Sequence, residues 1–400
     1  MAEPLVYGID VGTTKIVAIA GRADTNSGLV EVLSMGEAPS RGLKRGVVVD
    51  REATAESISR ALRRCEVQGG PVSVGIAGSH ISSVNTEVTL LNRSRNLTIT
   101  EDFVQQLEEE ARLASADEDM RVLHVVPREY VLDGSGGVKR PVGLAARRVT
   151  MRAHVVSGAV ASIQNLLSAV EDCGVEVSQV VLEPLASAEA CLSEKDREEG
   201  ICLVDVGGGT TDIAVFHRGA LSHTTVIPIG GESFSSDVAY GMKIPFDAAE
   251  RLKVRYGSVL SRTVDPVAAV KLGDRYYNAH FLSEILEYRA REVFEYTRDS
   301  LEKFQVKNLL PGGVVLTGGG SLLEGMTELC EEVLRIRTAN TAPSRVKGEL
   351  KAVQKPQYAT TIGLLHFSSQ NDNRLPEGEG ATKFSFGSIV AAIKSWFRGE

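Results

Sequence analysis

The sequence predicts an α/β protein of two related lobes, with an inserted subdomain and a C-terminal amphipathic helix. Segments rich in Val and Ile, bounded by Gly or Asp, alternate with segments of helical periodicity. A motif of strand, Asp, glycine turn and Thr-Thr occurs twice, around Asp10 and around Asp205, which indicates two related halves. The 400 residues are enough for two or three domains, each with its own core.

The regular elements follow from these patterns in chain order. Strands are predicted at residues 5–10, 15–21, 72–77, 200–205, 213–216 and 313–317. Helices are predicted at residues 51–65, 101–115, 159–172, 236–242, 281–304 and 322–334.

Two stretches are predicted to form modules of their own. An inserted subdomain is predicted at 85–156, and a mainly helical subdomain at 234–310. Ser, Asn, Gly, Glu and Pro dominate residues 368–383, which predicts a flexible linker before residues 384–400.

Charge and composition exclude several classes of protein. A net charge of -8 argues against a nucleic-acid partner, because binding phosphates requires an excess of Lys and Arg. The five cysteines form no Cys-x-x-Cys pair, which favours reduced thiols over disulfides or zinc. No signal peptide and no apolar run long enough to span a bilayer is present. We therefore expect a cytoplasmic protein whose membrane contact is peripheral.

The first candidate site is the sequence GIDVGTTK at residues 8–15. Gly12 permits a tight turn, and the amides and hydroxyls of Thr13 and Thr14 can point at an anion. Lys15 can supply a cation to the same anion. Taken alone, this pattern also fits an ordinary hairpin.

The pattern returns as DVGGGTTD at residues 205–212, again after an apolar strand. The residues expected to contact phosphate here are Gly207, Gly208, Gly209, Thr210 and Thr211. Asp10 and Asp205 end their strands beside the bound phosphates, where carboxylates can hold Mg²⁺, mostly through its waters. The alternative is that the two aspartates only cap turns.

A third glycine turn follows the strand predicted at 313–317, in the sequence VLTGGGS at 315–321. Gly318, Gly319 and Gly320 would let a nucleotide lie against the backbone, with the N-terminus of the next helix favouring its negative groups. No Walker-type loop and no complete Gly-x-Gly-x-x-Gly fingerprint is present. The seven histidines lack metal-ligand spacing and are interpreted as structural.

Together, the three glycine turns resemble the signature of the actin, Hsp70 and hexokinase superfamily. The resemblance implies two α/β lobes with ATP and Mg²⁺ in the cleft between them. It implies a first lobe at residues 1–84, 157–199 and 350–367, and a second lobe with its core at 200–233 and 311–349 that carries the helical subdomain. The sequence AERLK at 249–253 resembles the helix that contacts the ribose, which assigns Glu250 and Lys253 to the nucleotide; a surface salt bridge is the alternative. The sequence LEPLASA at 182–188 resembles the segment joining the lobes, which makes Glu183, with Asp205, a catalytic candidate.

Within that superfamily the chain resembles the FtsA family of bacterial cell-division proteins. The resemblance rests on the insert at 85–156 and on GSHI at 78–81, IPIGG at 227–231 and VRYG at 254–257. It adds Gly230 and Gly231 to the nucleotide site. It implies ATP binding with weak hydrolysis at most, and polymerisation in the ATP state.

The same resemblance implies partners at the division site, on the cytoplasmic face of the cell membrane. They are the C-terminal tail of the tubulin-like protein FtsZ, other copies of the chain, the anionic membrane surface and later division proteins. The FtsZ tail would dock on the helical subdomain through Arg289, in the sequence EYRARE at 287–292. This run departs from the family's more usual Glu-Pro-Arg-Tyr-like run, although the arginine is retained.

The last 17 residues, 384–400, carry an apolar face at helical spacing. Its members are Phe386, Ile389, Val390, Ile393, Trp396 and Phe397. With Lys383, Lys394 and Arg398 available for anionic lipid, the segment is predicted to be an interfacial helix. A core helix that docks on the protein itself is the alternative.

Two other proteins of this fold are the rival hypotheses. A sugar or acetate kinase would need a catalytic Asp in the cleft and would gain nothing from a membrane-binding tail. A PilM-like pilus scaffold keeps the nucleotide loops but usually lacks such a tail. The C-terminal helix therefore argues against both.

Overall fold

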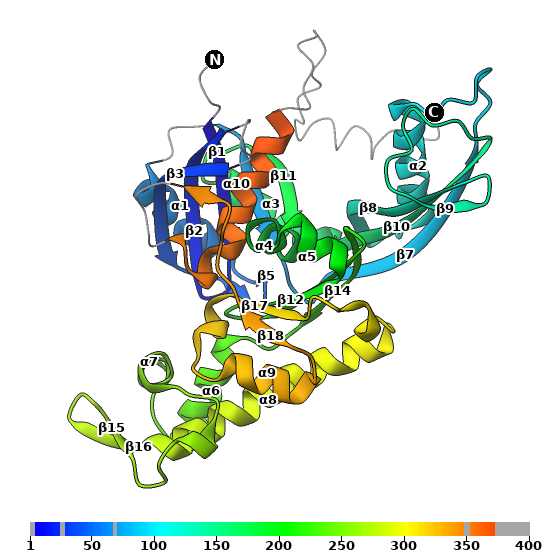
Figure 1. The fold of residues 1–400 in the computed structure, drawn as a ribbon. Helices are drawn as coiled ribbons and strands as arrows, with labels where there is room; N and C mark the ends of the chain where they lie inside the picture. Colours follow the sequence, from blue (N-terminus) through cyan, green and yellow to red (C-terminus); the bar gives the residue numbers. More distant parts are fainter. Residues whose placement is uncertain (1–4, 25–28, 67–69, 348–352, 373–400) are drawn as a thin grey trace.

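The computed structural model describes residues 5–24, 29–66, 70–347 and 353–372 (Figure 1). Each lobe is built on one sheet. In the first lobe the strand order is β11-β6-β1-β2-β3-β19. Their bounds are β11 Val177–Leu182, β6 Val72–Ile76, β1 Leu5–Val11, β2 Lys15–Asp24, β3 Leu29–Pro39 and β19 Val346–Lys347.

The sheet of the second lobe has the order β14-β13-β12-β17-β18. Their bounds are β14 Ala220–Ile227, β13 Thr211–His217, β12 Ile201–Val206, β17 Val314–Thr317 and β18 Thr338–Asn340. The antiparallel hairpin β12–β13 has β17 as a parallel neighbour of β12, just as the hairpin β1–β2 has β6 beside β1. The repeated sequence motif thus corresponds to a repeated hairpin, one in each lobe.

Helices cover both faces of the first sheet. On one face lie α1 (Arg51–Cys65) and α3 (Val160–Glu171), whose apolar side chains pack on β1, β2 and β6. On the other face lie α4 (Glu183–Cys191) and α10 (Ala359–Asp372), in an apolar cluster that continues into β12 and β13. These two helices therefore lie at the junction of the lobes, as Figure 1 shows.

Helices α4 and α10 cross at a point where no side chain separates them. A Cβ atom added to Gly363 on α10 would overlap the carbonyl oxygen of Ala186 on α4. Glycine is therefore required for this close approach.

The insert is a separate antiparallel sheet of order β7-β10-β8-β9, drawn in cyan and green to one side of Figure 1. Its elements are β7 Ile81–Leu91, α2 Glu101–Ala114, β8 Met120–Leu132, β9 Ser135–Val138 and β10 Arg148–Ala159. Helix α2 buries Leu107 and Ala111 against the sheet. The insert meets the second lobe through His154 on β10, which hydrogen-bonds Thr224 on β14 at 3.0 Å.

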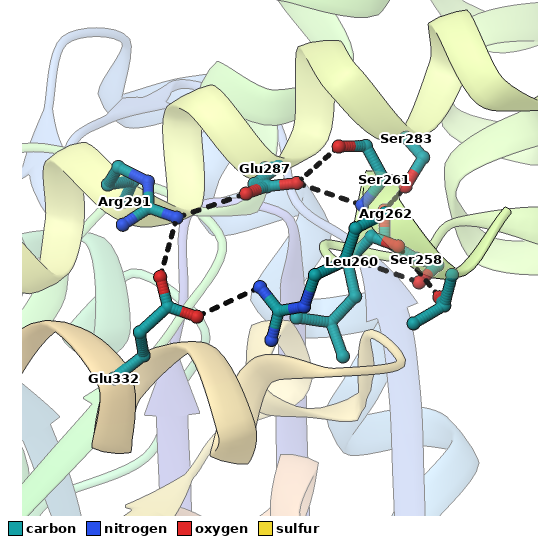
Figure 2. A network of polar contacts seen from close by, with 9 residues as sticks. Ser258, Leu260, Ser261, Arg262, Ser283, Glu287, Arg291 and Glu332 are labelled. Atoms are coloured by element: carbon teal, nitrogen blue, oxygen red, sulfur yellow. Dashed lines mark hydrogen bonds and ion pairs between the residues drawn. The ribbon is translucent and has the colours of Figure 1, made fainter.

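The second lobe carries a mainly helical subdomain with a projecting hairpin, β15–β16. Its elements are α6 Gly231–Met242, α7 Phe246–Tyr256, β15 Ala269–Leu272, β16 Arg275–Asn278 and α8 Ala279–Lys303. Figure 2 shows the polar network that ties α8 to the rest of the lobe. Arg291 on α8 donates to Glu287 at 3.0 Å and to Glu332 on α9 (Met326–Leu334) at 3.1 Å. Arg262 also donates to Glu332, and Ser261 to Glu287, so one loop and two helices are joined.

Several sequence-based boundaries are wrong. The helix predicted at 236–242 already begins at Gly231. The helix predicted from residue 322 begins at Met326, because a 3-10 turn, η3 (Gly319–Leu322), and the left-handed Gly325 (φ 85°) precede it. The predicted linker begins too early, since α10 continues to Asp372. The C-terminal helix predicted at 384–400 lies outside the described residues. Within the described part of the chain, no helix combines the length and apolar character needed to cross a bilayer.

Candidate functional site

The two Thr-Thr loops face each other across the boundary between the lobes. A Cβ atom added to Gly208 would lie 2.5 Å from the side chain of Thr14, and one added to Gly209 would overlap Thr13. Only glycine allows the loops to approach so closely. The fold therefore brings together the two copies of the motif.

A cleft of about 340 Å³ lies between these loops. The sequence-predicted residues that line it are Asp10, Gly12, Thr13, Thr14, Lys15, Glu183, Asp205, Gly207, Gly208, Gly209, Thr210, Gly231, Glu250, Lys253, Gly318, Gly319 and Gly320. Two predicted residues do not line it. Thr211 is buried and donates to the carbonyl oxygen of Ile229 at 2.8 Å, while Gly230 packs against the backbone of Gly208. Both residues therefore stabilise the second loop without lining the cleft.

Five carboxylates line the cleft, those of Asp10, Glu183, Asp205, Asp212 and Glu250. Burial raises the pKa of the first four, and repulsion from neighbouring carboxylates raises it further. The pKa of Asp205 rises to about 6 and that of Asp212 to about 8. Asp212 ends the second motif, but it is not among the site residues predicted from the sequence. Such a cluster favours a ligand that brings positive charge.

Two buried polar atoms in the cleft, Nζ of Lys15 and Oδ1 of Asp212, lack a hydrogen-bond partner among the described residues. Lys15 lies 3.6 Å from Glu37 and 4.0 Å from the centre of the Tyr358 ring. One cation beside several carboxylates fits a ligand made of phosphates and a divalent metal. Across the described ranges, no three acidic, His or Cys side chains converge to hold a metal ion alone. The two loop aspartates would therefore share Mg²⁺ with waters and phosphate oxygens.

The opposite end of the cleft is formed by α6 and α7. Lys253 is buried and donates to Glu250 at 2.7 Å and to the carbonyl oxygen of Gly231 at 2.9 Å. Glu250 also accepts a hydrogen bond from Ser235. The pair does form the salt bridge that was the alternative interpretation, but Lys253 is not on the surface. Both side chains line the cleft.

One segment of the site, residues 356–361, is not predicted by any motif in the sequence. Pro356, Gln357 and Thr360 line the cleft. The carbonyl oxygen of Pro356 accepts a hydrogen bond from the amide of Gly318 at 3.2 Å, which places the segment against the third loop. It contains no glycine and no acidic residue, so no motif in the sequence marks it.

The geometry defines what the cleft can do chemically. Backbone amides and threonine hydroxyls can surround a phosphate chain, with Lys15 as the cation. Glu183 can orient a water by hydrogen bonding, and burial beside Asp10, Asp212 and Asp205 raises the pKa of its carboxyl well above the ordinary value. The arrangement is suited to binding a phosphorylated ligand.

Asp212→Asn is expected to stabilise the nucleotide-free protein at alkaline pH. The folded-state pKa of Asp212, about 8, exceeds the ordinary 3.8, so between these values the folded state binds more protons than the unfolded state. The free energy of unfolding therefore falls as pH rises from about 4 to about 8. Asn cannot ionise, so the melting temperature of the variant should fall less over this range and be several degrees higher at pH 8.

Thermal melts from pH 5 to 8 test this prediction. Asp274→Asn, which changes an exposed acid on the projecting hairpin, is the matched control and should follow the wild type. Equal slopes for Asp212→Asn and the wild type would contradict the prediction.

Arg289, the predicted partner contact, does not line the cleft. Arg289 on α8 makes two hydrogen bonds to Asp237 on α6, at 2.5 and 3.0 Å, and an ion pair with Glu292. The residue predicted to meet a partner is therefore already neutralised within the subdomain. The six predicted membrane-contacting residues lie outside the described ranges.

Comparisons with known proteins agree with this architecture. Residues 202–363 match the family described as cell division protein FtsA, and residues 78–157 match the SHS2 domain inserted in FtsA. The cell division protein FtsA of Pseudomonas aeruginosa is 37% identical over 411 residues, covering 99% of this chain and 98% of the relative. That of Escherichia coli K12 is 34% identical, with 99% and 98% covered.

Solved structures give the fold. A PilM-PilN type IV pilus biogenesis complex covers 91% of this chain and 98% of its own, with a TM-score of 0.70 and 17% identity. MreB5 of Spiroplasma citri bound to ADP covers 93% of this chain and 99% of its own, with a TM-score of 0.55 and 12% identity. At these identities the likeness concerns the actin-like fold alone.

Proposed function

The chain belongs to the FtsA family of cell-division proteins, and from this premise we propose that it binds Mg²⁺ and ATP, polymerises in that state and attaches the FtsZ tail to the membrane. Membership of the family separates it from a small-molecule kinase and from a PilM-like scaffold, which share only the fold. Later division proteins would be recruited through the same filament, on the inner face of the cell membrane.

The observation that carries the nucleotide part of this proposal is the convergence of three glycine loops on one cleft. The two Thr-Thr loops touch across the lobes, and the third loop borders the same space. Structures of MreB5 of Spiroplasma citri, which has this fold, are described as bound to ADP and to AMPPNP. The triphosphate would lie between the loops, with its ribose beside Glu250 and Lys253.

Within this cleft, different residues would have different roles in binding Mg²⁺ and ATP. Asp10 and Asp205 would hold the waters of Mg²⁺, which neutralises phosphate charge when bound. Lys15 would bind a phosphate oxygen, and Glu183 would orient the attacking water. Hydrolysis would be weak at most, because turnover depends on positioning one water closely against the phosphate.

Residues 384–400 would supply the membrane attachment. Their apolar face is suited to the interface between headgroups and acyl chains, and their cations to anionic lipid. One such helix binds weakly, so a filament that carries many copies would bind by avidity.

Vesicle co-sedimentation of the full-length protein with a fluorescent FtsZ tail peptide tests the whole proposal. We expect the peptide to sediment only when protein, anionic vesicles and ATP are all present, and less in EDTA. Peptide recovery that is independent of vesicles would contradict the tether, and recovery that is independent of ATP would contradict the nucleotide-dependent filament.

Arg289→Glu is expected to reduce affinity for the FtsZ tail peptide several-fold while ATP affinity is unchanged. The substitution reverses the charge on α8 that would attract an acidic tail. Fluorescence anisotropy with the labelled peptide measures the effect.

Asp237→Asn provides the matched control, because it breaks the same tie between α6 and α8 but leaves the positive charge of Arg289. If Arg289 contacts the tail, this variant should bind as well as the wild type or better. Equal losses in both variants would mean that the ion pair only supports the subdomain, and unchanged binding in Arg289→Glu would locate the tail elsewhere.

A further inference from the structure

The short segment of residues 356–361 touches all three nucleotide loops at once. Tyr358 stacks on Lys15 of the first loop. The carbonyl oxygen of Pro356 accepts hydrogen bonds from the Gly318 amide at 3.2 Å and from the Thr317 hydroxyl at 3.3 Å, both at the third loop. The hydroxyl of Thr360 lies 3.3 Å from Oδ2 of Asp205, at the start of the second loop.

Two adjacent threonines in this segment hold the two loop aspartates. The hydroxyl of Thr361 donates to Oδ2 of Asp10 at 2.9 Å. The hydroxyl of Thr360 lies 3.3 Å from Oδ2 of Asp205, which also accepts a hydrogen bond from Ser187 on α4 at 2.6 Å. All five side chains are buried. Water therefore cannot replace these hydrogen bonds at low cost.

The hydroxyls select which carboxylate oxygen remains free. In both aspartates the bonded atom is Oδ2. The other oxygen, Oδ1, lies on the side of a cleft glycine, next to Gly12 for Asp10 and next to Gly318 for Asp205. These hydrogen bonds, together with that of Ser187 to Asp205, favour rotamers in which Oδ1 faces a glycine that lines the cleft.

We propose that Thr360 and Thr361 are positioning residues that set Asp10 and Asp205 in register for a Mg²⁺–nucleotide complex. Asp10 belongs to the first lobe and Asp205 to the second, so two halves of one metal site must be aligned across the cleft. Consecutive residues in the first turn of α10 achieve this, because their spacing is fixed by the helix. The inference rests on the proposed binding of Mg²⁺ and ATP.

The test compares ATP affinity in excess Mg²⁺ with affinity in EDTA, measured by calorimetry on the full-length protein. Thr361→Val and Thr360→Val keep the shape of the side chain but remove the hydroxyl. We expect each to reduce the Mg²⁺-dependent gain in affinity about tenfold, with little change in EDTA. Thr361→Ser keeps the hydroxyl and should restore the gain.

Thr297→Val is the matched control. Thr297 is also a buried helical threonine, on α8, and its hydroxyl bonds the Val293 carbonyl oxygen at 2.8 Å. This variant should keep the full Mg²⁺-dependent gain. If a valine variant does not fold, Thr361→Ala against Thr361→Ser gives a second comparison that differs by one hydroxyl.

The outcomes separate the inference from the proposed function. Wild-type protein that binds ATP no better with Mg²⁺ than with EDTA would overturn both. A normal gain in the wild type that is retained in Thr360→Val and Thr361→Val would overturn the positioning role alone. Equal losses with and without Mg²⁺ would also overturn it, because the hydroxyls would then shape the cleft rather than the metal site.

Discussion

Gly208→Asp is expected to abolish ATP binding while the protein remains folded. The added Cβ atom would lie 2.5 Å from the Thr14 side chain, so the two loops would be forced apart. The new carboxylate would also place negative charge where the phosphates would lie, in a cleft already lined by five carboxylates. We expect at least a hundredfold loss of affinity by calorimetry, together with near-normal circular dichroism.

Gly136→Asp is a suitable control, because it adds the same charge at an exposed glycine whose nearest atoms are 3.8 Å from the new Cβ. It should bind ATP normally.

Asp10→Ala removes a carboxylate that is proposed to hold Mg²⁺ in the same cleft. This variant should also lose ATP binding in the presence of Mg²⁺. Wild-type affinity in both Gly208→Asp and Asp10→Ala would refute the nucleotide site.

Deleting residues 384–400 is expected to release the protein from anionic vesicles while ATP binding persists. Each large apolar side chain that is fully buried contributes about 1.5–3 kcal/mol, less at the shallow depth of an interface. Removing the whole apolar face should therefore eliminate vesicle binding rather than weaken it. Avidity increases the combined affinity of many helices, but it requires that each helix binds the membrane weakly on its own. Flotation with vesicles measures the bound fraction.

Point variants distinguish the apolar face from the segment as a whole. Ile393→Asp combined with Trp396→Asp should release the protein as the deletion does. Ser388→Asp adds a negative charge on the other side of the predicted helix and should cause a much smaller loss. If the truncated protein floats as well as the full chain, the segment is not the membrane tether.

The sequence is most informative where function requires unusual backbone. The Thr-Thr loops could be predicted because close approach demands glycine, and a motif that occurs twice is conspicuous. Residues 356–361 could not, because they act through common hydroxyl and carbonyl groups. Thr361 and its partner Asp10 are 351 residues apart, so their contact depends on the tertiary fold.

The same limit explains the incorrect boundaries and the unexpected state of Arg289. Helical periodicity extends from Leu322 to Leu334, but it does not reveal that Gly325 adopts a left-handed conformation that delays the helix. The sequence shows an arginine on a charged helix, whereas its partner Asp237 belongs to another helix, 52 residues earlier. Periodicity describes one element at a time, and these features depend on two.

If α10 moves as a rigid body, the close contact between Gly363 and Ala186 is the point about which it would turn. At 1.5 Å per residue, the crossing point is about 4.5 Å along the helix from Thr360 and about 13.5 Å from Asp372. If the rigid helix turns about this fulcrum, Asp372 moves roughly three times as far as Thr360. A displacement of about 1 Å at Thr360, which contacts Asp205, would then become a displacement of about 3 Å at Asp372. Asp372 is the end of α10 from which the chain continues toward residues 384–400.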